Sequence, residues 1–103
     1  MCGRYDYTPG EFREIRIRWN LDKEFPLFKP RYNIAPGKQV PVIVQEAESN
    51  QMKLMRSGLV PSCASDPSIG NRMINARAET LAEKPSFMRL LTWRRCLVPA
   101  GGF

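Results

Sequence analysis

Residues 40–56 read VPVIVQEAESNQMKLMR, and this stretch decides the fold. Val40 to Gln45 are mainly apolar and β-branched, and the side chains from Met52 to Arg56 alternate, which is typical of strands. The mostly polar residues 46–50 between them predict the turn of a β-hairpin. Because Pro41 has no N–H to donate, we expect the first strand to lie on a sheet edge or to begin late.

A helix is predicted upstream of the hairpin, from about residue 9 to residue 19. The segment Thr8-Pro9-Gly10-Glu11 has the form of a capping box with proline at the first helical position. Phe12, Ile15 and Trp19 would then share one face of this helix, the spacing expected of a face that packs on a sheet.

The rest of the chain is divided by proline and glycine. Residues 24–38 and 61–71 hold several of these residues and predict two long ordered or functional loops. Ser86 is placed to cap a short helix. That helix would turn Phe87, Leu90 and Leu91 inward, and Cys96 to Val98 predict a buried strand.

Composition favours one small domain with a polyanionic partner. The chain has 103 residues, with 16 Lys plus Arg against 10 Asp plus Glu and a formal charge of +6. Three cysteines without metal-site spacing, and no histidine, predict reduced thiols and no metal or other cofactor. We find no apolar run of the ~20 residues that a membrane span needs, and we expect a cytoplasmic protein without membrane contact.

The opening Met1-Cys2-Gly3-Arg4-Tyr5 makes cysteine the first residue once Met1 is removed. An N-terminal cysteine carries two adjacent nucleophiles, a thiol of pKa about 8.5 and an α-amine of pKa about 7.7 to 8.0. The amine can form a Schiff base with an aldehyde, and the thiol can then close a five-membered thiazolidine. An internal cysteine cannot do this, because its nitrogen is part of an amide.

Four segments together resemble the SOS response-associated peptidase (SRAP) family. They are 1–5 (MCGRY), 31–37 (RYNIAPG), 58–72 (GLVPS and DPSIGNR) and 74–80 (INARAET). The resemblance covers the whole chain but only about the first half of a typical member, so residues 1–103 would be the N-terminal part of a single SRAP domain. It implies an α+β fold with a β-barrel-like, mostly antiparallel sheet and short flanking helices, incomplete here.

The resemblance also implies a function in the response to DNA damage. In the SRAP family the exposed cysteine forms a thiazolidine cross-link with the ring-opened sugar of an abasic site in single-stranded DNA. A peptidase activity, including release of the first methionine, is attributed to the same family. The partner would be single-stranded DNA with abasic sites, and the protein would associate with the nucleoid when bound.

Individual residues match the family's motifs. Cys2 matches the nucleophile, and Asn75 matches an active-site asparagine whose amide can both donate and accept hydrogen bonds. Arg4 and Arg77 match residues that grip the DNA backbone, since a guanidinium fork suits phosphate geometry. Pro36 lies where the family places a rigid loop against DNA. Two further residues, Asn33 and Glu79, would hold these loops in position.

The chain departs from the family at several points. Ser57 and Cys63 stand where tryptophans are usual, which removes stacking surfaces worth ~1 to 3 kcal/mol per base. The family's acidic residue and histidine lie beyond Phe103. If these groups transfer protons during ring opening and Schiff-base formation, their loss would slow the reaction by ~10²- to 10⁴-fold each.

Two alternatives remain open. Glutamine amidotransferases, a class of N-terminal-nucleophile amidohydrolases, also begin Met-Cys-Gly, although segments 31–37 and 74–80 would then be unexplained. The chain can also be a non-catalytic module for single-stranded nucleic acid. Such a module would bind through arginines alone, namely Arg4, Arg72, Arg77, Arg94 and Arg95.

Overall fold

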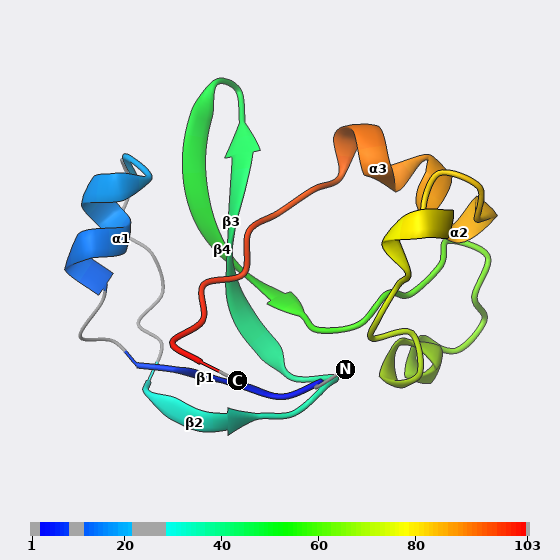
Figure 1. Cartoon of the computed structure of the whole chain (residues 1–103), viewed down its shortest axis with the longest axis horizontal. Coiled ribbons are helices and arrows are strands. Elements are labelled where there is room, and N and C mark those ends of the chain that lie inside the picture. The colour runs from blue at the N-terminus through cyan, green and yellow to red at the C-terminus, as the bar shows by residue number, and fades with distance from the viewer. Residues whose placement is uncertain (1–2, 9–11, 22–28, 103) are drawn as a thin grey trace.

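A computed structural model describes residues 3–8, 12–21 and 29–102 of the chain. Most of its strands lie in the first half of the chain, and short helical elements follow them (Figure 1). The strands are β1 (Tyr5–Tyr7), β2 (Arg31–Ile34), β3 (Gln39–Glu46) and β4 (Ser49–Arg56). The helical elements are α1 (Phe12–Arg18), the 3₁₀ turns η2 (Pro67–Asn71) and η3 (Ala78–Thr80), α2 (Pro85–Met88) and α3 (Leu90–Trp93).

The predicted hairpin is confirmed. β3 and β4 pair antiparallel from Gln39 opposite Arg56 to Glu46 opposite Ser49. The turn is shorter than residues 46–50, because only Ala47 and Glu48 leave the ladder, with φ of +48° and +67°. Positive φ at both central residues is the geometry that matches the twist of a two-residue hairpin.

Pro41 lies inside β3 and is fully buried. Ile43 exchanges both backbone hydrogen bonds with Leu97, so Ile43 and its i−2 neighbour Pro41 direct their backbone nitrogens away from β4. Pro41 therefore costs the hairpin ladder no hydrogen bond. β3 has a full partner on one side only, as the proline predicts.

The expected loop over residues 24–38 is wrong for Arg31–Ile34, which form β2. β2 pairs antiparallel with β1, with Tyr5 opposite Ile34 and Tyr7 opposite Arg31. Ile34 is fully buried, so packing of this apolar side chain outweighs the prolines that flank the segment. Residues 24–28 of the expected loop lie outside the described residues.

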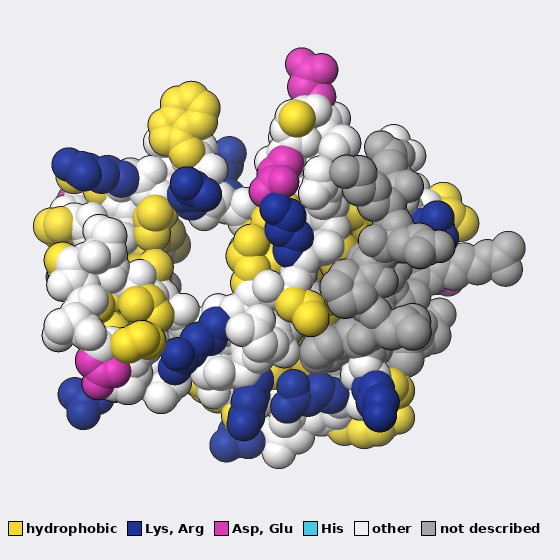
Figure 2. Space-filling model, turned by 180° about the vertical axis from the view of Figure 1, so that it is seen from behind, with side chains coloured by type: hydrophobic (Ala, Val, Ile, Leu, Met, Phe, Trp, Pro, Cys, Tyr) yellow, Lys and Arg dark blue, Asp and Glu magenta, His cyan; other side chains and the backbone are white. Residues whose placement is uncertain are grey.

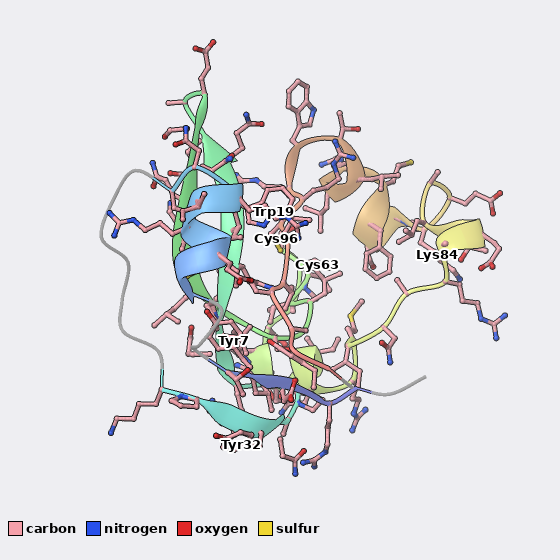
Figure 3. The ribbon with its side chains drawn as sticks, turned by 60° about the vertical axis from the view of Figure 1, so that its left-hand side comes forward. Tyr7, Trp19, Tyr32, Cys63, Lys84 and Cys96 are labelled. Carbon is pink, nitrogen blue, oxygen red and sulfur yellow. The ribbon has the colours of Figure 1, made fainter. Side chains whose placement is uncertain are left out.

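The core lies on both faces of β3. Tyr7 and Ile34 pack against Val40 and Val42 on one face. Leu21 and Met52 pack with Ile43 in a second cluster, as expected when alternate residues of one strand face opposite ways. Figure 3 shows Tyr7 turned toward the strands and Tyr32 on β2, and these side chains are 1% and 76% exposed.

The predicted helix is confirmed for Phe12–Arg18, while residues 9–11 lie outside the described part of the chain. Its Ile15 packs against both core clusters. Trp19 lies in the turn after the helix and is 37% exposed, so it does not continue the buried face.

The segment after α3 joins the two sheets (Figure 1). Leu97 bonds to Ile43 of β3, and Asp6 of β1 bonds to Gly101 and Gly102. The predicted buried strand at 96–98 is wrong, because only an isolated bridge forms and Leu97 and Val98 are about half exposed. Among the described residues the strands close no barrel, and the α+β class with antiparallel pairing is confirmed.

The C-terminal helices differ from expectation at their start. Lys84 is the N-cap of α2 and Pro85 its first residue, so Ser86 lies inside the helix and does not cap it. Lys84 has ψ of 125°, the extended conformation favoured before proline, and this sets the helix start. Phe87 and Leu90 are half-buried and Leu91 is exposed. None of the described helices is both long and apolar enough to span a membrane.

Candidate functional site

Two of the predicted site residues, Arg4 and Asn75, line a pocket of about 320 Å³, which we call the N-terminal pocket. The pocket is lined by the start of the chain and by the ends of β3 and β4 that lie away from the hairpin turn. Residues from the segments after β4 complete the lining. Its floor is largely apolar, with Val40, Val42 and Ile74 among its residues. Six residues bring polar side chains to it: Arg4, Tyr5, Arg56, Ser57, Asn75 and Cys96.

Gly3 lies close to two other segments of the chain at this pocket. A Cβ on Gly3 would lie 3.0 Å from Cδ1 of Ile74 and 3.5 Å from Cγ of Pro36. The residue after Cys2 is therefore in contact with the residue before Asn75 and with the loop that carries Pro36. Cys2 itself lies outside the described residues. A Cβ at position 3 would require the end of the Ile74 side chain to shift by a few tenths of an ångström, whereas its contact with Pro36 would be ordinary.

The backbone holds Asn75 in place from the other side. Gly58 has φ of +116°, and a Cβ there would lie 2.1 Å from the carbonyl oxygen of Gly70. The Leu59 N–H donates to the Met73 carbonyl at 2.9 Å. Residues 58–59 are thereby clamped against residues 70–73, and this clamp sets the direction in which the chain reaches Asn75.

Arg4 is held by a residue of strand β2. Its Nη1 donates to Oδ1 of Asn33 at 3.3 Å. Because an amide oxygen carries no net charge, this bond orients the guanidinium group without neutralising it. Asn33 thus contacts Arg4 directly, while contact of Arg4 with DNA stays a prediction.

Arg77 and Glu79 are exposed and do not line the N-terminal pocket. Arg77 is the N-cap residue of η3, where its side chain makes no capping hydrogen bond, and Glu79 lies in the first turn. On the face in Figure 2, Lys and Arg gather along the lower edge, where β1 and β2 lie, and acidic side chains are sparse there. A positive surface of this kind favours a polyanion.

Sequence reasoning missed three polar residues of the pocket. The Tyr5 hydroxyl is buried with no hydrogen-bond partner among the described residues. Burial raises the pKa of Tyr5, against the opposing charge of Arg31, so the hydroxyl stays a donor at neutral pH. Packing around the sulfur likewise raises the pKa of the Cys96 thiol, although the residue as a whole is exposed. Arg56 is the third. Nothing in the alternating strand patterns marked these residues.

The two departures from tryptophan have different positions. Ser57 lines the N-terminal pocket. Cys63 is exposed and lines a separate hollow with Asp66 and Arg72. The loss of an aromatic ring at position 57 therefore bears on the pocket directly, whereas Cys63 brings no thiol to its lining.

The part of the chain that the structure describes contains no group of three or more His, Cys, Asp or Glu residues arranged to hold a metal ion. The pocket's polar groups are guanidinium, amide, hydroxyl and thiol groups. They suit an anionic ligand with hydroxyl or carbonyl groups.

Comparison with known proteins gives the family. The family model described as SOS response associated peptidase (SRAP) matches residues 1–103. The chain belongs to the SRAP family. Gly3 lies near Pro36 and lines the pocket with Asn75, and these residues come from three of the four segments that carried the resemblance.

Three curated SRAP relatives come from Bacillus subtilis (strain 168). The abasic site processing protein YobE is 44% identical, YoqW 43% and YoaM 41%, each over all of this chain. The chain covers 48%, 46% and 46% of these relatives, so it spans about half their length. No solved structure matches it.

Proposed function

We propose that this chain recognises abasic sites in single-stranded DNA and forms a thiazolidine cross-link to them through Cys2 after Met1 is removed. The observation that carries the proposal is the contact of Gly3 with Ile74 and Pro36. It brings the start of the chain to a pocket that also holds Arg4 and Asn75. The names of the relatives, abasic site processing proteins, point to the same substrate.

The cross-linking chemistry needs no oxidant or cofactor. The α-amine of Cys2 adds to the C1′ aldehyde of the ring-opened sugar, and the adduct loses one water to give an imine. The thiol then adds to the imine carbon, and its proton goes to nitrogen. One C–N bond and one C–S bond form, and the carbonyl oxygen leaves as water.

Asn75 and Arg4 would act on the substrate in different ways. The Asn75 amide can donate to a sugar oxygen and accept from the attacking amine, and it adds no charge that competes with phosphate. Arg4, oriented by Asn33, would bind a phosphate next to the abasic sugar. Arg77 would bind the strand outside the pocket, since it lies on the exposed side of η3.

A peptidase activity that releases Met1 belongs to the same proposal, because removal of Met1 frees the α-amine. We also propose that the protein acts in the cytoplasm and associates with the nucleoid when bound to DNA. Both statements concern the whole protein. This chain spans about half the length of its curated relatives.

A denaturing gel tests the cross-link. The processed protein is incubated with single-stranded DNA that carries a natural abasic site, and then heated in detergent. We expect a slow band that survives heating and is absent for Cys2→Ala. Retention of the band in Cys2→Ala would reject thiazolidine chemistry. A shift seen only in native gels, and lost on denaturation, would favour the non-catalytic binding module.

The amidohydrolase alternative has less support. It accounts for the opening residues but not for the contact of Gly3 with Ile74 and Pro36. Release of ammonia from glutamine by the processed protein, without any adduct on abasic DNA, would restore it.

A further inference from the structure

Arg56 brings a second guanidinium group to the N-terminal pocket. It is the last residue of β4, whereas Arg4 precedes β1, so the two side chains reach the pocket from different strands. Both arginines line the pocket together with Asn75. Arg56 matches no position that the family resemblance assigned to DNA.

The orientation of Arg56 is set by a neutral partner. Its Nη2 donates to Oδ1 of Asn71 at 3.0 Å, which parallels the bond from Arg4 to Asn33. No carboxylate among the described residues lies within ion-pair distance of Arg56. No described carboxylate therefore neutralises Arg56 in an ion pair, and four of its five N–H donors remain for a ligand.

The charge of Arg56 lowers the pKa of Asp66, but both carboxylate oxygens of Asp66 accept hydrogen bonds from Ser68. Oδ1 accepts from the Ser68 N–H at 3.0 Å and Oδ2 accepts from the Ser68 hydroxyl at 2.7 Å, which caps η2. These two bonds are the main reason why the pKa of Asp66 lies below its usual value, and the charge of Arg56 adds a smaller effect. Asp66 thus serves the turn and does not neutralise Arg56.

Asn71 is itself fixed by the loop after β2. Gly37 has φ of +82°, and a Cβ there would lie 2.5 Å from Oδ1 of Asn71. The Gly37 N–H donates to the Ser57 carbonyl, and the Ser57 N–H donates to the Lys38 carbonyl, both at 2.9 Å. Glycine at 37 is required because its missing side chain leaves room for the amide that holds Arg56.

We propose that Arg56 is a second phosphate-binding residue of the pocket, positioned by Asn71. It binds one phosphodiester group of the DNA strand, and Arg4 binds another phosphodiester group of the same strand. This rests on the proposed function. Two guanidinium groups on one pocket would fix the strand so that the sugar between the phosphates faces Asn75. A bidentate fork gives this contact direction as well as charge.

The test measures binding without the covalent step. The probe is a single-stranded oligonucleotide with a tetrahydrofuran abasic analogue, which has no aldehyde. Affinity is measured between about 50 and 200 mM salt. We expect Arg56→Gln to bind about fivefold more weakly at ~100 mM salt, with the slope of log K against log salt reduced by about 0.7.

Three further variants separate charge from structure. Arg18→Gln removes the same charge from α1, away from the pocket, and should leave affinity and slope almost unchanged. Arg56→Lys keeps the charge and should keep most of the slope. Asn71→Asp supplies a carboxylate partner for Arg56 and should weaken binding about as much as Arg56→Gln. If Arg56→Gln fails to fold, Arg56→Lys and Asn71→Asp decide the question.

Equal salt slopes for Arg56→Gln and Arg18→Gln would overturn the phosphate site, as would unchanged affinity in Asn71→Asp. The proposed function is judged separately, by the adduct that unsubstituted protein forms on natural abasic DNA. A normal adduct with unchanged salt slopes rejects only the role of Arg56. Absence of both adduct and analogue binding in the unsubstituted protein rejects both proposals.

Discussion

Two hollows among the described residues contrast in size and chemistry. The larger, about 590 Å³, lies between α1 and residues 97–100, and we call it the α1 groove. Its charged groups are Glu14 and Arg18, which carry opposite signs, and its remaining lining is largely apolar. The N-terminal pocket is about 320 Å³ and brings two arginines to one asparagine. The α1 groove is therefore the larger of the two, whereas the N-terminal pocket has the side chains that suit a DNA-binding site.

The two hollows differ because the backbone segments around them approach each other to different degrees. The N-terminal pocket is built where segments distant in sequence approach one another through glycine, at Gly3, Gly37 and Gly58. The α1 groove is left where a single helix and an isolated bridge cover one side of β3. Close approach that only glycine permits marks a place where geometry is constrained. Substitutions in the two hollows should accordingly have different consequences.

Gly58→Ala should have the largest effect and would break the framework of the N-terminal pocket. The new Cβ meets the Gly70 carbonyl and the backbone has a strongly positive φ, so we expect a loss of about 2 to 4 kcal/mol in the free energy of unfolding. Urea denaturation measures this. Gly102→Ala is the control, since its Cβ would make an ordinary contact at 3.6 Å, and equal losses in the two variants would contradict the clamp.

Asn75→Ala tests the chemistry of the N-terminal pocket. We expect the cross-linking rate on natural abasic DNA to fall about 10²-fold, the effect of removing one well-placed hydrogen-bond donor from a reacting centre. Single-turnover gels measure it. Unfolding should be unaffected because Asn75 is exposed. A rate equal to that of the unsubstituted protein would remove Asn75 from the reaction.

Arg4→Ala and Arg77→Ala compare a residue inside the pocket with one outside it. Each substitution should lower the slope of log K against log salt by about 0.7. Binding releases fewer counterions from the DNA when one phosphate contact is missing. Arg4→Ala should also slow cross-linking at saturating DNA, whereas Arg77→Ala should not. Salt slopes that match the unsubstituted protein in both variants would show that neither arginine contacts phosphate.

Leu97→Ala should have the smallest effect and probes the α1 groove. The side chain is 46% exposed, so its truncation should cost less than about 1.5 kcal/mol in unfolding free energy, and cross-linking should not change. Ile17→Ala, at a helix position 73% exposed, is a control that should cost almost nothing. A large loss of cross-linking in Leu97→Ala would mean that the groove takes part in the chemistry.

Prediction from sequence worked best where local pattern decides the structure. The hairpin of β3 and β4 was predictable because its two strands adjoin in sequence and each shows a strand pattern. β2 was not, because a four-residue strand between prolines is stabilised by pairing with β1, far along the chain. Ser86 misled for a local reason, since Pro85 before it begins the helix.

The candidate site divides in the same way. Motifs in the sequence predict Cys2 as the nucleophile and Asn75 as a site residue, and the structure places Asn75 in the lining of the N-terminal pocket. The contact between Gly3 and Ile74, and the hydrogen bond from Arg56 to Asn71, depend on loops meeting in space. In the sequence, Arg56 is one polar residue of an alternating strand pattern. Such a pattern does not show which pocket the side chain of the last residue lines.

The most direct measurement of the central claim is the intact mass of processed protein after reaction with single-stranded DNA that carries one natural abasic site. The thiazolidine mechanism predicts a species with the mass of the chain without Met1 plus that of the oligonucleotide minus one water. It should form without any reducing agent and withstand heating. Formation of an adduct only after borohydride trapping, or an adduct on a chain that retains Met1, would contradict the claim.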